Sequence, residues 1–121
     1  MKYDDNNIFA KILRGEIPCE KIYEDNFVLS FYDINPQKKI HALVIPKGKY
    51  IDLDDFSEKA SSDEMIGLLK GLKIVAQKLQ ISTDKGKGYR ILSNISEDGG
   101  QEVPHLHFHL FGGEKIGKMV Q

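Results

Sequence analysis

Seven residues near the C-terminus, from His105 to Phe111, alternate between imidazole and apolar side chains. Because successive residues of a β-strand point to opposite faces, the alternation predicts a strand whose three imidazoles share one face. Leu106, Phe108 and Leu110 then share the other face, which is apolar enough to enter a core. Aligned groups that gain charge near neutral pH are poor fillers of a sheet, so we interpret the histidine face as functional.

The composition restricts the class of protein. The chain has 121 residues, 40% hydrophobic and 29% charged, and we expect residues 1–121 to form a single domain. A net charge of -1 provides no basic surface for a nucleic-acid backbone, so no nucleic-acid partner is expected. The N-terminus lacks a signal-peptide pattern and no apolar run is long enough to span a bilayer. We therefore expect a cytoplasmic protein that does not bind membranes.

The first half of the chain has the pattern of short elements. Apolar residues recur at helical spacing before Gly15 and predict a short helix. Runs bounded by turn residues predict three strands, at 21–24, 28–32 and 40–45. This half is typical of an antiparallel meander.

The longest predicted element is a helix from Ser61 to Leu79, because its apolar residues form one continuous stripe. Ser61 and Glu64 have the spacing of a capping box, which satisfies open N–H groups at a helix start. Gly67 and Gly71 lie inside the helix, and each costs about 1 kcal/mol relative to alanine. Their presence favours close packing against a sheet or a partner helix.

Two further strands are expected, at 89–95 and 103–111, on either side of a glycine-rich loop at 96–102. The order of elements favours an α+β fold with an antiparallel sheet, one face of which is covered by the long helix. The imidazoles then lie on the opposite face, or that face meets a second copy of the chain.

Three imidazoles on one face are candidate zinc ligands. Alternate residues of a strand lie about 6.5–7 Å apart, however, so parallel rings converge poorly on one ion. Cys19 is the single cysteine, which excludes a zinc site built on a cysteine pair. We expect no metal and no other cofactor, and elemental analysis of the purified protein distinguishes the two alternatives.

Covalent catalysis suits the pattern better. A neutral imidazole is a good nucleophile toward phosphorus when its other ring nitrogen donates a hydrogen bond that fixes the tautomer. His107 is the central ring, and its neighbours can bind phosphate oxygens or transfer a proton to the leaving group. Gly99 and Gly100 precede the strand and allow backbone N–H groups to approach an anion closely.

The segment 99–113 resembles the signature of the histidine triad (HIT) superfamily, and specifically its Hint branch of purine nucleoside phosphoramidases. Segments 7–12, 15–18, 31–36 and 41–47 are similar to Hint segments in the same order, so the resemblance covers nearly the whole chain. It implies a HIT-like fold: a five-stranded antiparallel sheet with one long and one short helix, extended across a homodimer.

The resemblance also implies roles for individual residues. His107 attacks the α-phosphorus of a purine nucleotide and forms a nucleotidyl-histidine intermediate, which water hydrolyses. His41 and His105 orient the site, and His109 acts at the phosphate or the leaving group. Asp33 accepts hydrogen bonds from the ribose hydroxyls. The other implied nucleotide contacts are an apolar slot for the base and a loop around the phosphate: Ile8, Phe9, Ile12, Phe31 and Ile34, then Asn94, Gly100, Gln101 and Glu102.

The function that follows is hydrolysis of the phosphorus–nitrogen bond of AMP or GMP derivatives, for example adenosine 5'-phosphoramidate to AMP and an amine. Two alternatives are a dinucleoside polyphosphate hydrolase and a non-catalytic nucleotide-binding protein that acts as a regulator or scaffold. Glu102 stands where many animal Hint proteins have a serine, and the C-terminal tail lacks their tryptophan. The leaving-group acid and the substrate preference are therefore left open.

Overall fold

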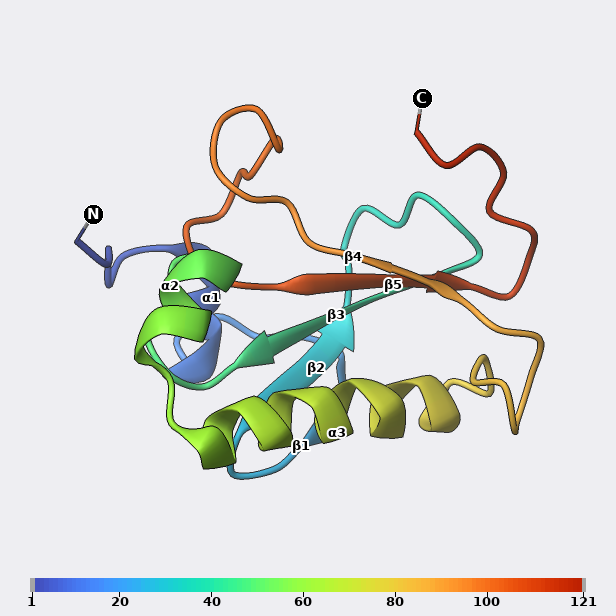
Figure 1. Ribbon diagram of the computed structural model, residues 1–121, viewed down its shortest axis with the longest axis horizontal. Coiled ribbons are helices and arrows are strands. Elements are labelled where there is room, and N and C mark those ends of the chain that lie inside the picture. The colour runs from blue at the N-terminus through green and yellow to red at the C-terminus, as the bar shows by residue number, and fades with distance from the viewer. Residues whose placement is uncertain (1, 121) are drawn as a thin grey trace.

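Five strands form one antiparallel sheet in the computed structural model, which describes residues 2–120 (Figure 1). Their spatial order is β1-β2-β3-β5-β4. The strands are β1 (Lys21–Glu24), β2 (Val28–Tyr32), β3 (Ile40–Pro46), β4 (Arg90–Leu92) and β5 (Phe108–Gly112). The expected α+β fold with a five-stranded antiparallel sheet is thereby confirmed.

Three helices accompany the sheet: α1 (Ile8–Leu13), α2 (Leu53–Lys59) and α3 (Ser62–Lys78). The sequence predicted α1 and α3 but not α2, which begins where the Asp52 carboxylate accepts the N–H of Asp55. The long helix α3 packs against β1, β2 and β3 (Figure 1). Within residues 2–120, no helix is long and apolar enough to cross a membrane.

The capping box at the start of α3 is present, because Ser61 Oγ accepts the Glu64 N–H and the Glu64 carboxylate accepts the Ser61 N–H. The two helical glycines pack on the sheet rather than on a partner helix. A Cβ at Gly67 would lie 2.4 Å from Cγ of Phe27, and one at Gly71 would lie 2.7 Å from Cγ2 of Val28. Only glycine lets the helix approach this closely.

The sheet buries side chains on both faces, in two apolar clusters. The cluster beneath α3 includes Leu106 and Leu110, as the alternation predicted. The cluster on the opposite face receives Phe9 from α1 and four side chains from β2 and β3: Leu29, Phe31, Leu43 and Ile45. The histidine face of the C-terminal strand therefore lies on the same side of the sheet as α1.

The last two strands are shorter than predicted, since β4 spans Arg90–Leu92 and β5 begins only at Phe108. Backbone groups before β5 bond elsewhere: the Leu106 N–H donates to the Tyr50 carbonyl, and the His107 carbonyl accepts the Ser93 hydroxyl at 2.7 Å. Two of the three histidines consequently precede the strand, and His105 lies in a bend in which its N–H donates to the Val103 carbonyl.

Candidate active site

A cavity of about 470 Å³ lies on the face of the sheet that carries α1. It is lined by every implied nucleotide contact except Gln101: Ile8, Phe9 and Ile12 from α1, Phe31, Asp33 and Ile34 at the end of β2, Asn94, Gly100 and Glu102 from the loop, and His107 and His109. The N-terminal helix α1 and the C-terminal histidine segment thus line the same cavity. The volume is within the usual range for small-molecule sites.

Within residues 2–120, one ring nitrogen of His107 makes no hydrogen bond. Its Nδ1 lies 2.6 Å from the His105 carbonyl oxygen, which can only accept, so Nδ1 carries the proton and Nε2 keeps its lone pair. Burial lowers the pKa of His107, which keeps the ring neutral at neutral pH. Phe9 packs edge-to-face against the ring, with centroids 4.9 Å apart, and limits its rotation.

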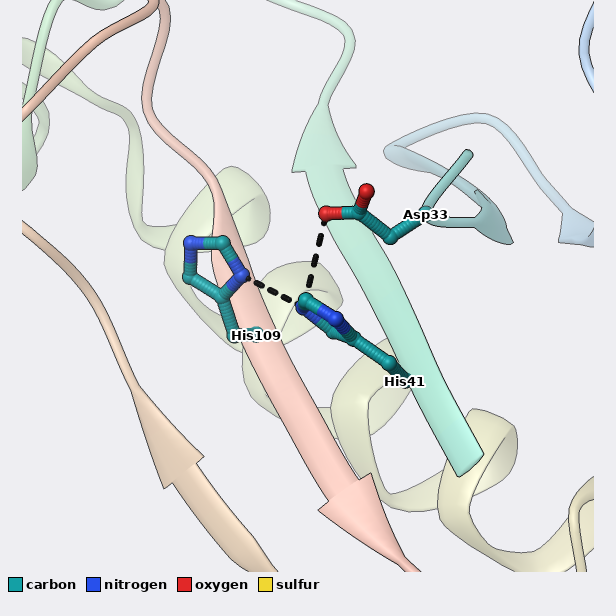
Figure 2. A group of neighbouring side chains, drawn as sticks. All are labelled: Asp33, His41 and His109. Atoms are coloured by element: carbon teal, nitrogen blue, oxygen red, sulfur yellow. Dashed lines mark hydrogen bonds and ion pairs between the residues drawn. The ribbon is translucent and has the colours of Figure 1, made fainter. Parts of the chain in front are cut away.

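A second group of side chains consists of Asp33, His41 and His109 (Figure 2). Its His109 ring lies next to His107, with ring centroids 5.1 Å apart. The Gln37 N–H donates to Nδ1 of His41, so the His41 proton is on Nε2. That Nε2–H lies 2.9 Å from Nδ1 of His109 and donates to it. His109 must then carry its proton on Nε2, and this ring lines the cavity.

Burial lowers the pKa of His109 to about 4, and repulsion from His107 and His41 in their protonated forms contributes less. At neutral pH the ring is therefore a neutral N–H donor. A neutral imidazole is a poor proton donor but a good hydrogen-bond donor. The His109 N–H is therefore suited to donate a hydrogen bond to a phosphate oxygen.

Asp33 has two contacts at the end of β2. One carboxylate oxygen accepts the Asn35 N–H at 2.8 Å, which is the turn contact expected of an Asp in this position. The other lies 3.4 Å from Nε2 of His41. The carboxylate therefore supports a turn and faces the site at the same time.

His105 is fully buried and does not line the cavity. Its Nε2–H donates to the Pro46 carbonyl at 2.9 Å, and its Nδ1 accepts the Tyr3 hydroxyl at 2.6 Å. Burial lowers the pKa of His105 to about 4. The His105 ring is thus neutral. It influences the cavity only by holding its own backbone, whose carbonyl contacts His107.

The loop before the histidines differs from the expected phosphate-binding nest. The N–H groups of Gly100 and Gln101 donate to the carbonyls of Glu97 and Ser96, so neither is free to bind an anion. The Gln101 side chain donates to the Ile51 carbonyl at 2.7 Å and accepts the Ser96 N–H, which explains its absence from the cavity wall. Within residues 2–120 the Glu102 N–H makes no hydrogen bond, and Glu102 lines the cavity.

Within residues 2–120, Asp33, His41 and His109 also form the group that could hold a metal ion, because one ligand atom from each lies within 4.8 Å of the others. They are not the three histidines of the strand alternation. The hydrogen bond between the two imidazoles satisfies the same nitrogens without an ion, so the expectation of a metal-free site stays a prediction.

Several residues of the site carried no signal in the sequence. Tyr3, Gln37 and Ser93 hold histidines through single hydrogen bonds, and their partners are fixed only by the fold. Cys19 lines the cavity, and burial raises the pKa of its thiol, so it is not a thiolate nucleophile.

Fold and site together define a small α+β domain with imidazoles in the wall of a ligand-sized cavity. Residues 14–116 match the family model described as the HIT domain. The chain belongs to the HIT domain family.

Relatives and solved structures agree with this assignment. The chain is 53% identical over 118 residues to an uncharacterized 13.2 kDa HIT-like protein of Azospirillum brasilense, covering 98% of this chain and 94% of the relative. A HIT family hydrolase from Clostridium thermocellum superposes with a TM-score of 0.85 at 36% identity, covering 98% and 99% of the two chains. A histidine triad nucleotide-binding protein from Candida albicans superposes with a TM-score of 0.76 at 33% identity, covering 87% and 73%.

Proposed function

We propose that the protein is a hydrolase of the Hint branch, which cleaves the phosphorus–nitrogen bond of purine nucleoside phosphoramidates. The observation that carries the proposal is the neutral His107, whose Nδ1–H is held by the His105 carbonyl and whose Nε2 is the free nitrogen in a cavity-lining ring. The similar solved structures include a HIT family hydrolase and a histidine triad nucleotide-binding protein, which support a hydrolase that acts on nucleotides.

The proposed reaction has two displacements at phosphorus. The Nε2 lone pair of His107 attacks the α-phosphorus, the phosphorus–nitrogen bond breaks, and the departing amine takes up a proton. Because neutral His109 is a weak acid, we propose that water donates this proton to the amine. The His109 N–H then donates a hydrogen bond to a phosphate oxygen. Water then attacks the nucleotidyl-histidine, which releases the nucleoside monophosphate and restores the ring.

The rest of the cavity fits a purine nucleoside monophosphate. Apolar side chains of α1 and β2 offer a slot for the flat base, and Asp33 offers a carboxylate that can accept from two ribose hydroxyls. The unused N–H of Glu102 is the loop donor that we assign to the phosphate. A dinucleoside polyphosphate requires the same nucleophile, so relative rates on the two substrate types decide between them.

The proposal is tested by incubating the protein with adenosine 5'-phosphoramidate and following AMP release by chromatography. The wild type is expected to release AMP, and His107→Ala to be slower by at least about 1000-fold, because the nucleophile is lost. Thr83→Ala, at an exposed position outside the cavity, is the matched control. Folded wild type that releases no AMP, or an undiminished His107→Ala, contradicts the proposal. In the first case, a wild type that binds AMP in calorimetry is identified as a non-catalytic binding protein.

A further inference from the structure

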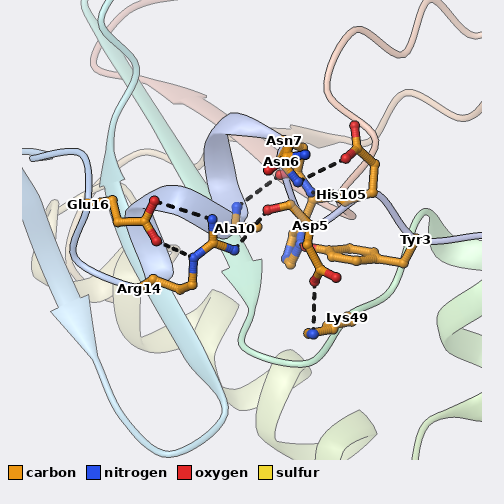
Figure 3. Close-up of polar contacts among 10 residues, drawn as sticks. Tyr3, Asp5, Asn6, Asn7, Ala10, Arg14, Glu16, Lys49 and His105 are labelled. Atoms are coloured by element: carbon orange, nitrogen blue, oxygen red, sulfur yellow. Dashed lines mark hydrogen bonds and ion pairs between the residues drawn. The ribbon is translucent and has the colours of Figure 1, made fainter.

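Tyr3 lies in the segment that precedes α1, and it contacts a histidine 102 residues further along the chain (Figure 3). Its hydroxyl is 2.6 Å from Nδ1 of His105, and the two rings meet edge-to-face with centroids 5.6 Å apart. The Pro46 carbonyl accepts from Nε2 of His105, so the proton of this neutral ring is on Nε2. Nδ1 is therefore the acceptor, and the phenol is the donor.

The same histidine holds the proposed nucleophile with its backbone. The His105 carbonyl oxygen accepts the Nδ1–H of His107 at 2.6 Å. Tyr3 thus anchors the His105 ring, and the His105 backbone fixes the tautomer and direction of His107. Phe9 packs against both imidazoles, with centroid distances of 6.4 Å to His105 and 4.9 Å to His107. A loosened His105 would shift the ring that is proposed to attack phosphorus.

The segment that carries Tyr3 is itself attached to the domain at two places (Figure 3). Asp5 pairs with Lys49 at 2.8 Å, and its carbonyl accepts from the Arg14 guanidinium at 2.8 Å. Asn7 then begins α1 by accepting the Ala10 N–H at 2.9 Å. These contacts hold the segment before α1 against the domain, so the Tyr3 hydroxyl is kept next to the buried His105 ring.

We propose that Tyr3 is a positioning residue for the hydrolysis: its hydroxyl holds His105, and through the His105 carbonyl it aligns His107 for attack. This inference rests on the proposed role of His107. Tyr3 does not line the cavity, so it acts on the chemical step and not on nucleotide binding. Removing the hydroxyl leaves a buried ring nitrogen without a partner, and the ring is then held from one side only.

The decisive variant is Tyr3→Phe, which keeps the aromatic contact and removes only the hydroxyl. We expect kcat for AMP release to fall by about three- to tenfold, the range expected for one lost hydrogen bond, with KM and the Kd for AMP within about twofold of wild type. Lys2→Ala is the matched control, because it changes an exposed side chain next to Tyr3 and leaves both the phenol and the Asp5–Lys49 pair in place. Its kcat is expected to equal that of wild type.

A second measurement does not depend on turnover. Nitrogen NMR of the histidine rings reports whether Nδ1 of His105 accepts a hydrogen bond, and its resonance is expected to shift toward the free-acceptor value in Tyr3→Phe only. Wild-type kcat in Tyr3→Phe, or an unshifted Nδ1 resonance, overturns the inference. A fall in kcat that matches the unfolded fraction of the variant overturns it as well. If the wild type releases no AMP, the proposed function fails, and the NMR comparison still decides whether Tyr3 holds His105.

Discussion

At the scale of the residue, the protonation pattern of the four histidines follows from what each ring can bond. The backbone carbonyls of His105 and Pro46 can only accept, and the Gln37 N–H can only donate, so three contacts decide which nitrogens carry protons. The His41–His109 bond then follows without a further choice. The sequence predicted a neutral nucleophile at position 107, but the choice of nitrogen depends on a carbonyl whose direction only the fold sets.

Burial of these rings makes the stability of the protein depend on pH. The pKa values of His105 and His109 are lowered to about 4, against about 6.5 in an unfolded chain. Below about pH 6.5 the unfolded state therefore binds more protons than the folded state, so stability is full above pH 6.5 and is lost as the pH falls toward 4. For His105 alone the loss is about 3 kcal/mol.

Urea unfolding between pH 7 and pH 4 measures this loss, and His105→Gln is expected to flatten the pH dependence. Proton NMR provides the control, since the His105 ring is expected to show no titration above about pH 5. A His105 ring that titrates near its ordinary pKa contradicts the account of its burial.

At the scale of the element, much of the fold could be predicted from local patterns. The apolar stripe of α3, its capping box and the alternation around β5 are local signals, and each element is present. The position of His41 in the site could not be predicted from a local pattern. It depends on the register that pairs His41 with Phe111 and Leu43 with His109, and no local pattern encodes a register between strands 68 residues apart.

The edge strand β4 leads to a prediction about dimer formation. The strand β4 is an outer strand, and it exposes two apolar side chains, Ile91 and Leu92. An exposed apolar edge strand favours pairing with another chain, which supports the homodimer that the HIT resemblance implies. We expect the wild type to sediment as a dimer and Leu92→Asp to sediment as a monomer, with Thr83→Asp as the exposed control. A monomeric wild type contradicts the expected dimer, and a dimeric Leu92→Asp excludes β4 from the interface.

At the scale of the whole molecule, the two faces of the sheet have different tasks. One face is covered by α3 and forms a core that holds β3 and β5 together. The other face carries α1 and the cavity, so the apolar residues of the histidine alternation are buried beneath α3 while His107 and His109 line the cavity on the opposite face. The N-terminal segment also contacts this side of the molecule, because the Tyr3 hydroxyl donates to His105. These long-range contacts join the ends of the chain, and local sequence patterns do not predict them.

The central claim is that Nε2 of His107 forms a covalent bond to the phosphorus of a nucleotide. Its most direct test is to mix excess protein with adenosine 5'-phosphoramidate, stop the reaction within milliseconds in alkaline denaturant, and measure intact and peptide masses. We expect the mass of the wild type to increase by one adenylyl group, bound to the His107 side chain in the peptide that contains it, and no such adduct in His107→Ala. An adenylyl group on any other residue, or AMP release from His107→Ala at the wild-type rate, would contradict it.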